Sequence, residues 1–154
     1  MTFYGLIGLG CLALLVLVAL FLFPRVSGSV PETRGSRRDL KRHLGKLLDS
    51  KDHRRVLVIA VPDSEDFLRF RTLDGKLKIE FPLITRRQKL LEPLVRDAAK
   101  IRALELGEER SGEGGRILVS WVAMGEFQAA ELASALLEKI YGVHSGAFLD
   151  YHFK

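Results

Sequence analysis

The feature that most constrains this chain is an uninterrupted apolar segment at its N-terminus. From Phe3 to Phe23 there are 21 consecutive residues without a charged side chain, mostly Leu, Val, Ala, Phe and Gly. With a rise of about 1.5 Å per residue, a helix of this length spans roughly 31 Å, which is close to the thickness of a bilayer's hydrocarbon core. The sequence therefore predicts that residues 1–24 form a transmembrane anchor.

Two other targeting signals fit this segment less well. A cleaved secretory signal has a basic region before a short apolar core, whereas no Lys or Arg precedes Arg25 here and the apolar run is longer than such a core. A lipoprotein signal would use Cys11, but the apolar run continues from residue 12 to residue 23. We therefore interpret the segment as an uncleaved anchor.

The excess positive charge of the chain lies directly after this segment. Residues 25–55 contain 10 Lys and Arg against 4 Asp and Glu, whereas residues 56–154 contain 14 against 15. Positive residues gather on the cytoplasmic side of membrane spans. We therefore expect a single-pass protein of the inner (plasma) membrane, with its N-terminus outside and its C-terminal domain in the cytoplasm. The near neutrality of that domain argues against nucleic acid as a partner.

Residues 25–35 are rich in Ser, Gly, Pro and Thr and are expected to form a linker. A helix is predicted to begin at Ser36, which forms a capping-box pattern with Asp39. Its Leu stripe is typical of the first core helix of a domain, and its basic face is typical of a helix lying on anionic headgroups; both interpretations stay open. The residues expected to contact the membrane surface are Arg25, Arg34, Arg37, Arg38, Lys41 and Arg42.

The pattern changes to strands after residue 55. Residues 56–61 form a β-branched run typical of a buried strand, and residues 67–81 surround an Asp74-Gly75 dipeptide typical of a two-residue hairpin turn. The turn sets the register, so that one face of the hairpin is apolar. The other face is expected to be solvated or to bind a partner, and it carries Arg69, Arg71, Lys78 and Glu80.

The rest of the chain predicts two helical regions and two strands. The helical regions are residues 85–106, with Pro93 kinking the helix or starting a new one, and residues 126–141, ended by Gly142. Residues 107–115 are predicted to form a polar loop, residues 117–124 a buried strand, and residues 147–154 a last strand at a sheet edge.

The expected fold class is α+β, in which the N-terminal transmembrane helix is followed by a small two-layer sandwich. The sandwich, predicted to span residues 36–154, has a mostly antiparallel five-stranded sheet and about three helices.

The sequence contains no pattern typical of a catalytic, cofactor or metal site. Its single Cys lies in the apolar segment and its four His are scattered, without metal-ligand spacing. The Gly-rich residues 107–115 lack the Lys-Ser/Thr pair that follows a phosphate-binding loop. Trp121, Phe127 and Tyr141 are expected in the core, because aromatic side chains dominate core area. We therefore expect a protein that is not an enzyme and that has no cofactor.

The order of elements, the hairpin FLRFRTLDGKLKIEF and the ending AAELASALLEKIYGVHSGAFLDYHF resemble domains related to type III secretion chaperones, the TY-Chap group, over residues 36–154. The resemblance implies a small α+β domain that binds protein partners and has no catalytic residues. It transfers no site residue to this chain.

The first functional hypothesis is a membrane-anchored protein-interaction module, an accessory or assembly subunit of a membrane-associated complex. Its expected partners are the lipid bilayer and a protein of unknown identity, and self-association stays open. The alternative is a membrane-tethered ligand-binding or enzymatic domain with a pocket between sheet and helices. A third hypothesis is a module that binds the membrane surface alone.

Overall fold

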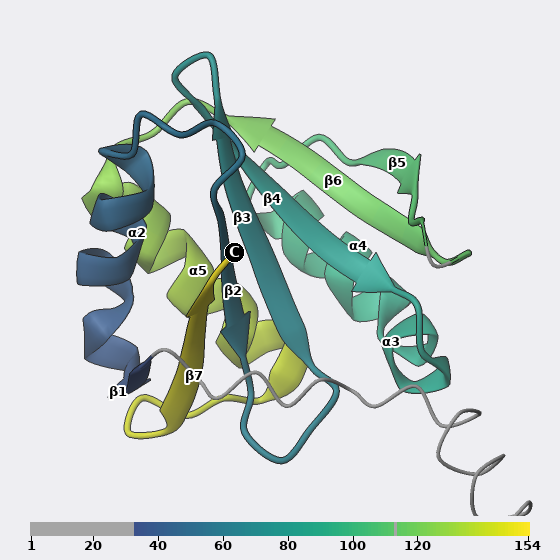
Figure 1. Cartoon of the computed structure of the whole chain (residues 1–154). Helices are drawn as coiled ribbons and strands as arrows, with labels where there is room; N and C mark the ends of the chain where they lie inside the picture. The colour runs from purple at the N-terminus through teal and green to yellow at the C-terminus, as the bar shows by residue number, and fades with distance from the viewer. Residues whose placement is uncertain (1–32, 113) are drawn as a thin grey trace, which may run out of the picture. The chain divides into compact units, whose positions relative to one another are not determined.

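An antiparallel sheet is the main element of the computed structural model, which describes residues 33–112 and 114–154. Within these residues the sheet has seven strands: β1 (Thr33–Ser36), β2 (Val56–Ala60), β3 (Phe67–Leu73), β4 (Lys76–Leu83), β5 (Gly107–Arg110), β6 (Arg116–Val122) and β7 (Phe148–Phe153). Their order across the sheet is β1-β7-β2-β3-β4-β6-β5, and every pairing is antiparallel (Figure 1).

The helices cover one face of this sheet. The described residues form a short 3-10 helix and four α-helices: η1 (Arg37–Asp39), α2 (Leu40–Leu48), α3 (Arg86–Leu90), α4 (Glu92–Ile101) and α5 (Glu126–Tyr141). The strands pass in front of α4 and α5 in Figure 1, and α2 packs on α5 and contacts β2 and β3. The core lies between these layers and includes the fully buried Phe70, Ile79 and Leu137.

Local sequence explains the central hairpin and the longest helix. Asp74 and Gly75 both have positive φ, 51° and 72°, as a two-residue hairpin turn requires, and Phe70 pairs with Ile79 as predicted. Helix α5 ends at Gly142, which has a φ of 69°, and the Val143 N–H donates to the Leu137 carbonyl. These predictions are confirmed.

The predicted five-stranded sheet with three helices was wrong. The described sheet has seven strands because residues 33–36, placed mostly in the predicted linker, form β1, and residues 107–110, predicted as loop, form β5. Both strands have four residues and no apolar pattern. Strand β1 is formed by pairing with β7, which is distant in sequence, and β5 is formed by pairing with the longer β6. Strand β7 lies between β1 and β2 rather than at an edge.

The helical region predicted over residues 85–106 is shorter than expected, but the prediction that Pro93 starts a new helix is confirmed. Thr85 caps α3 by accepting from the Gln88 N–H, and Pro93 lies in the first turn of α4. Residues 102–106 are not helical, because Ala103 adopts a φ of 52° and ends the helix.

Within residues 33–112 and 114–154, no helix combines the length and the apolar character needed to cross a bilayer. The segment predicted to span the membrane, residues 1–24, lies outside the described residues. The fold class is accordingly corrected to an α+β domain with a seven-stranded antiparallel sheet and four helices, without a transmembrane helix among the described residues.

Candidate functional site

A cluster of charged side chains lies on the sheet face opposite the helices. On β3 and β4 these side chains alternate with core residues, and the register sets Arg69 opposite Glu80 and Arg71 opposite Lys78. Glu109 of β5 completes the group through an ion pair with Lys78. We call these five residues the charged cluster: Arg69, Arg71, Lys78, Glu80 and Glu109.

Glu80 is the centre of the charged cluster. Its side chain is 4% exposed, and its carboxylate lies 3.1 Å from Arg69 Nε, 3.2 Å from Arg71 Nε and 3.4 Å from Lys78 Nζ. A buried carboxylate is costly unless it is paired, so these three cations stabilise it in place. The Arg69 and Arg71 side chains are 23% and 43% exposed, so the face presents cations above a buried acid.

Lys78 connects the centre of this face to its edge. Its ammonium lies 2.6 Å from the Glu109 carboxylate, and it also lies 5.4 Å from the centroid of the Trp121 ring. Trp121 pairs directly with Lys78 across β4 and β6, so the cation lies over the indole face, a geometry that stabilises both groups.

The expectation that Trp121 and Phe127 belong to the core was wrong, and Phe127 on α5 is 59% exposed. The Trp121 side chain is 42% exposed, because successive residues of a strand point to opposite faces and the neighbouring Ser120 faces the helices. The segment ILVSWVAM shows no alternation of apolar and polar residues, because apolar side chains lie on both faces of the strand. Ile117 and Val119 are buried although they share the face of Trp121. Glu109 was missed because nothing local in GEER distinguishes a strand from a loop.

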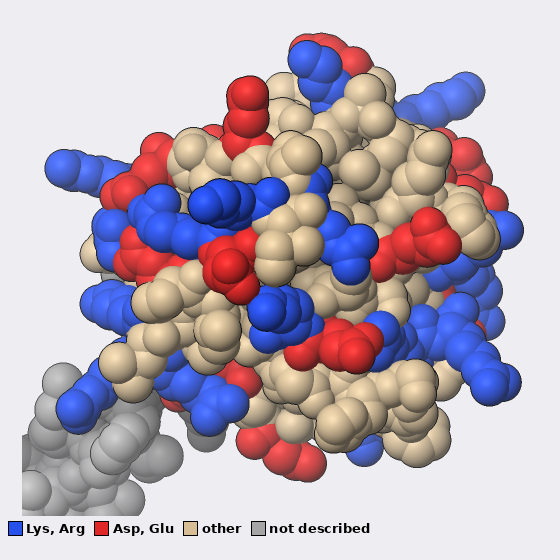
Figure 2. Space-filling model, turned by 180° about the vertical axis from the view of Figure 1, so that it is seen from behind, with Lys and Arg blue, Asp and Glu red and all other residues tan. Residues whose placement is uncertain are grey.

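The residues predicted to contact the membrane surface do not form a free basic face. Arg25 lies outside the described residues, and four of the others pair with acids of the same domain: Arg34 with Asp150 at 2.9 Å, Arg37 with Glu138 at 2.8 Å, Lys41 with Glu126 at 3.6 Å and Arg42 with Asp39 at 3.1 Å. Of the five described members, Arg38 alone is exposed without an ion pair. Lys and Arg side chains are likewise interspersed with Asp and Glu over the face shown in Figure 2.

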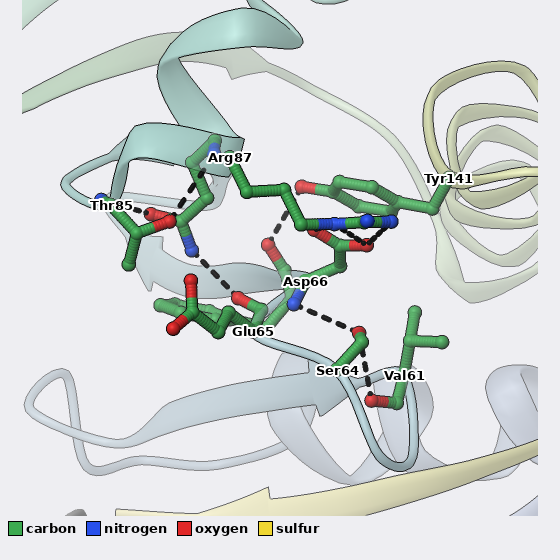
Figure 3. Close-up of polar contacts among 9 residues, drawn as sticks. Val61, Ser64, Glu65, Asp66, Thr85, Arg87 and Tyr141 are labelled. Atoms are coloured by element: carbon green, nitrogen blue, oxygen red, sulfur yellow. Dashed lines mark hydrogen bonds and ion pairs between the residues drawn. The ribbon is translucent and has the colours of Figure 1, made fainter.

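A second polar cluster joins the β2–β3 turn to the helices (Figure 3). The Asp66 side chain, 2% exposed, accepts three hydrogen bonds of 2.8–3.1 Å from Arg87 of α3, and these bonds raise the pKa of Arg87. Tyr141 of α5 donates to the Phe67 carbonyl at 2.9 Å. Burial, and then the charge of Asp66, raise the pKa of Tyr141 well above its usual range. Every contact in this cluster is internal, so its role is to hold the turn.

Two hollows lie on the described surface, and neither is the pocket between sheet and helices that a ligand-binding domain would use. One of about 520 Å³ is lined by Ser36, Arg37, Arg38, Ser134, Ser145 and Gly146. The other, of about 190 Å³, adjoins it and shares Arg37, Arg38 and Ser134. Residues 33–112 and 114–154 hold no group of three His, Cys, Asp or Glu side chains that could bind a metal ion.

No protein-family model, no curated protein and no solved structure matches this chain. The resemblance to TY-Chap domains therefore stays a prediction from the sequence pattern.

Proposed function

We propose that this chain is a membrane-attached protein-interaction module, an accessory or assembly subunit, which binds its partner through the charged cluster and Trp121. The observation that carries the proposal is the arrangement around Glu80, where the partly exposed Arg69 and the half-exposed Arg71 are held above a buried carboxylate. Their positions are fixed before any partner arrives, so binding costs little side-chain entropy.

The chemistry of this face favours an acidic partner segment with an aliphatic or aromatic side chain. Three cations and two acids form the cluster. The Glu80 acid is buried beneath the Arg side chains, and the Glu109 acid, which is 46% exposed, is paired with Lys78, so the exposed donors that can bind a further acid belong to Arg69 and Arg71. A carboxylate on the partner would accept from Arg71, and an apolar side chain would pack on Trp121. Arg and Trp are the residue types that most often dominate interface energetics.

The membrane part of the proposal rests on the sequence. The uncharged segment at residues 3–23 attaches the domain to the inner membrane, and the basic charge in residues 25–55 favours the cytoplasmic side for the domain. The partner is then a protein at the same membrane. The resemblance to TY-Chap domains supports a protein partner as well.

A peptide titration tests the chemistry of the face. Trp121 is the single Trp of the chain, so its emission reports on this face alone. An alternating Leu-Glu peptide should shift the emission of the full chain in uncharged detergent to shorter wavelength, whereas an alternating Leu-Lys peptide should not. An equal response to both peptides, or none to the acidic one, would reject the proposed chemistry.

Crosslinking then tests the function in native membranes. A photoreactive residue replaces Trp121 in one variant and Phe127 in a matched control, because Phe127 is 59% exposed and lies on α5 rather than on the sheet. A specific protein adduct from position 121, reduced by Arg71→Gln and absent from position 127, supports the module. Adducts from position 127 alone, or adducts insensitive to Arg71→Gln, contradict it.

Conservative single variants are needed here because the cluster is part of the fold. Reversing the charges of Arg69, Arg71 and Lys78 together would surround the buried Glu80 with acids and unfold the domain. Arg71→Gln removes one exposed cation and leaves Arg69 and Lys78 beside Glu80.

A further inference from the structure

The larger hollow has a lining rich in hydrogen-bond donors and free of acids. Its volume of about 520 Å³ falls within the range of small-molecule sites, about 300–1,000 Å³. Three elements distant in sequence form it: the start of η1 with Arg37 and Arg38, α5 with Ser134, and the segment before β7 with Ser145 and Gly146. Two guanidinium groups and three hydroxyls line it.

Arg37 is fixed as one wall of this hollow. Its guanidinium donates to the Ser134 hydroxyl, to the Val143 carbonyl at 2.9 Å and to the Glu138 carboxylate at 2.8 Å, and its side chain is only 13% exposed. The hydrogen bond from Arg37 lowers the pKa of Glu138, so this pair stays ionised. Arg37 therefore supplies a rigid guanidinium, its charge balanced by Glu138, with two of its five N–H groups unassigned.

Arg38 and two hydroxyls supply the free donors. Arg38 is exposed and has no ion pair among the described residues, so all of its side-chain N–H groups are available. Ser134 accepts from Arg37, which leaves its own proton free to donate, and Ser145 has no hydrogen bond within the described part of the chain. Ser36 differs, because its hydroxyl donates to Asp39 at 3.1 Å.

We propose that this hollow is a binding site for a phosphate ester, held by Arg38, Arg37 and the Ser134 and Ser145 hydroxyls. A phosphate group offers several acceptor oxygens and negative charge, which match a lining made of donors and two guanidinium groups. The hollow of about 520 Å³ also has room for the rest of a small ester, such as the glycerol of glycerol 3-phosphate. The source is either a soluble phosphate ester or an anionic phospholipid headgroup.

Calorimetry of the full chain in uncharged detergent tests the site with glycerol 3-phosphate as the probe. Saturable binding is expected, and Arg38→Gln should weaken it about tenfold or more, the usual effect of losing a charge-assisted hydrogen bond. Arg54→Gln is the matched control, because Arg54 is also exposed, has no ion pair within the described residues and does not line the hollow. Both variants should keep the wild-type circular dichroism spectrum.

A second experiment identifies the source of the phosphate group. Amide hydrogen exchange of residues 36–38 and 144–147 is measured in phosphatidylcholine nanodiscs with and without phosphatidylglycerol. Protection that requires phosphatidylglycerol and disappears in Arg38→Gln assigns the site to a lipid headgroup. Binding of glycerol 3-phosphate without such protection assigns it to a soluble ester.

The proposal is overturned if neither probe binds, or if Arg54→Gln weakens binding as much as Arg38→Gln, which would indicate non-specific charge attraction. This site lies apart from Trp121 and the charged cluster, so failure here leaves the peptide and crosslinking tests of the protein-interaction module untouched.

Discussion

The Lys78 ammonium lies 2.6 Å from the Glu109 carboxylate, although β6 separates the strands that carry them, β4 and β5. The Lys78 side chain thus crosses the face of the neighbouring strand, beside the Trp121 ring, to reach the sheet edge. The pair joins the short edge strand to the centre of the charged cluster. A partner that binds Trp121 would therefore also contact the ion pair that secures β5.

Replacing Glu80 with Gln should lower the free energy of unfolding by about 2 kcal/mol. The carboxylate is buried and compensates three cations. Arg69, whose side chain is 23% exposed, would lose its one ion pair among the described residues, whereas Lys78 would keep Glu109. Urea unfolding followed by circular dichroism measures the change. The control is Glu108→Gln, which removes an exposed acid 3.4 Å from Arg116 and should cost less than about 0.5 kcal/mol. Equal effects of the two variants would contradict the central role of Glu80.

Arg87→Gln and Arg96→Gln form a second matched pair. Both arginines are half-exposed, but Arg87 pairs with Asp66, which is 2% exposed, whereas Arg96 pairs with Glu92 on the surface of α4. Arg87→Gln leaves a buried carboxylate without its cation and should clearly lower the denaturant midpoint. Arg96→Gln should lower the midpoint little, because its ion pair lies on the surface. Denaturant midpoints compare the two, and a larger effect at Arg96 would refute the assignment.

The domain should lose stability at alkaline pH through Tyr141. Burial, and then Asp66, raise the pKa of Tyr141 in the folded state above the usual value of about 10. The phenol's contribution is therefore complete below about pH 10 and declines as pH rises further, by up to about 1.4 kcal/mol per pH unit. Burial also raises the pKa of Tyr151.

Unfolding measured at pH 9 and pH 11 checks this linkage. The loss of stability between the two pH values should be smaller in Tyr141→Phe than in the wild-type chain, because Phe has no proton to lose. The same variant at pH 9 reports separately on the hydrogen bond to the Phe67 carbonyl. Identical pH dependence in both proteins would show that Tyr141 titrates alike in the folded and unfolded states.

Two glycines near the end of α5 should respond differently to alanine. A Cβ on either Gly142 or Gly146 would meet no atom within 4 Å, but Gly142 has a φ of 69° and Gly146 is not in the left-handed region. Gly142→Ala should therefore cost about 1 kcal/mol through backbone strain, and Gly146→Ala should be neutral or slightly stabilising. Thermal unfolding of both variants separates strain from packing. Equal destabilisation by both would contradict this explanation.

The parts of the fold that follow from local chemistry were predictable. Asp74-Gly75 determines the hairpin register because both residues need positive φ, and Gly142 determines the end of α5 for the same reason. Strands β1 and β5 were not predictable, because TRGS and GEER carry no apolar alternation. Their conformation depends on backbone pairing with β7 and β6, which sequence periodicity does not report.

The candidate site was predictable in outline. The hairpin register places Arg69, Arg71, Lys78 and Glu80 on one face, and they lie there. The burial of Glu80 could not be read from the sequence, because it results from three cations meeting over it. Arg38 also could not be distinguished from its basic neighbours, since the pairing of Arg34, Arg37, Lys41 and Arg42 depends on acids that are mostly far along the chain.

The position of β7 determines when this domain can complete its sheet. Strand β7 lies between β1 and β2, and even Lys154 exchanges both backbone hydrogen bonds with Val56. During synthesis, β1 therefore has no partner strand, and β2 has one open edge, until residues 148–154 have left the ribosome. Until then the nascent domain is incomplete and exposes a strand edge and core side chains. A chain truncated before Phe148 would remain in this incomplete state.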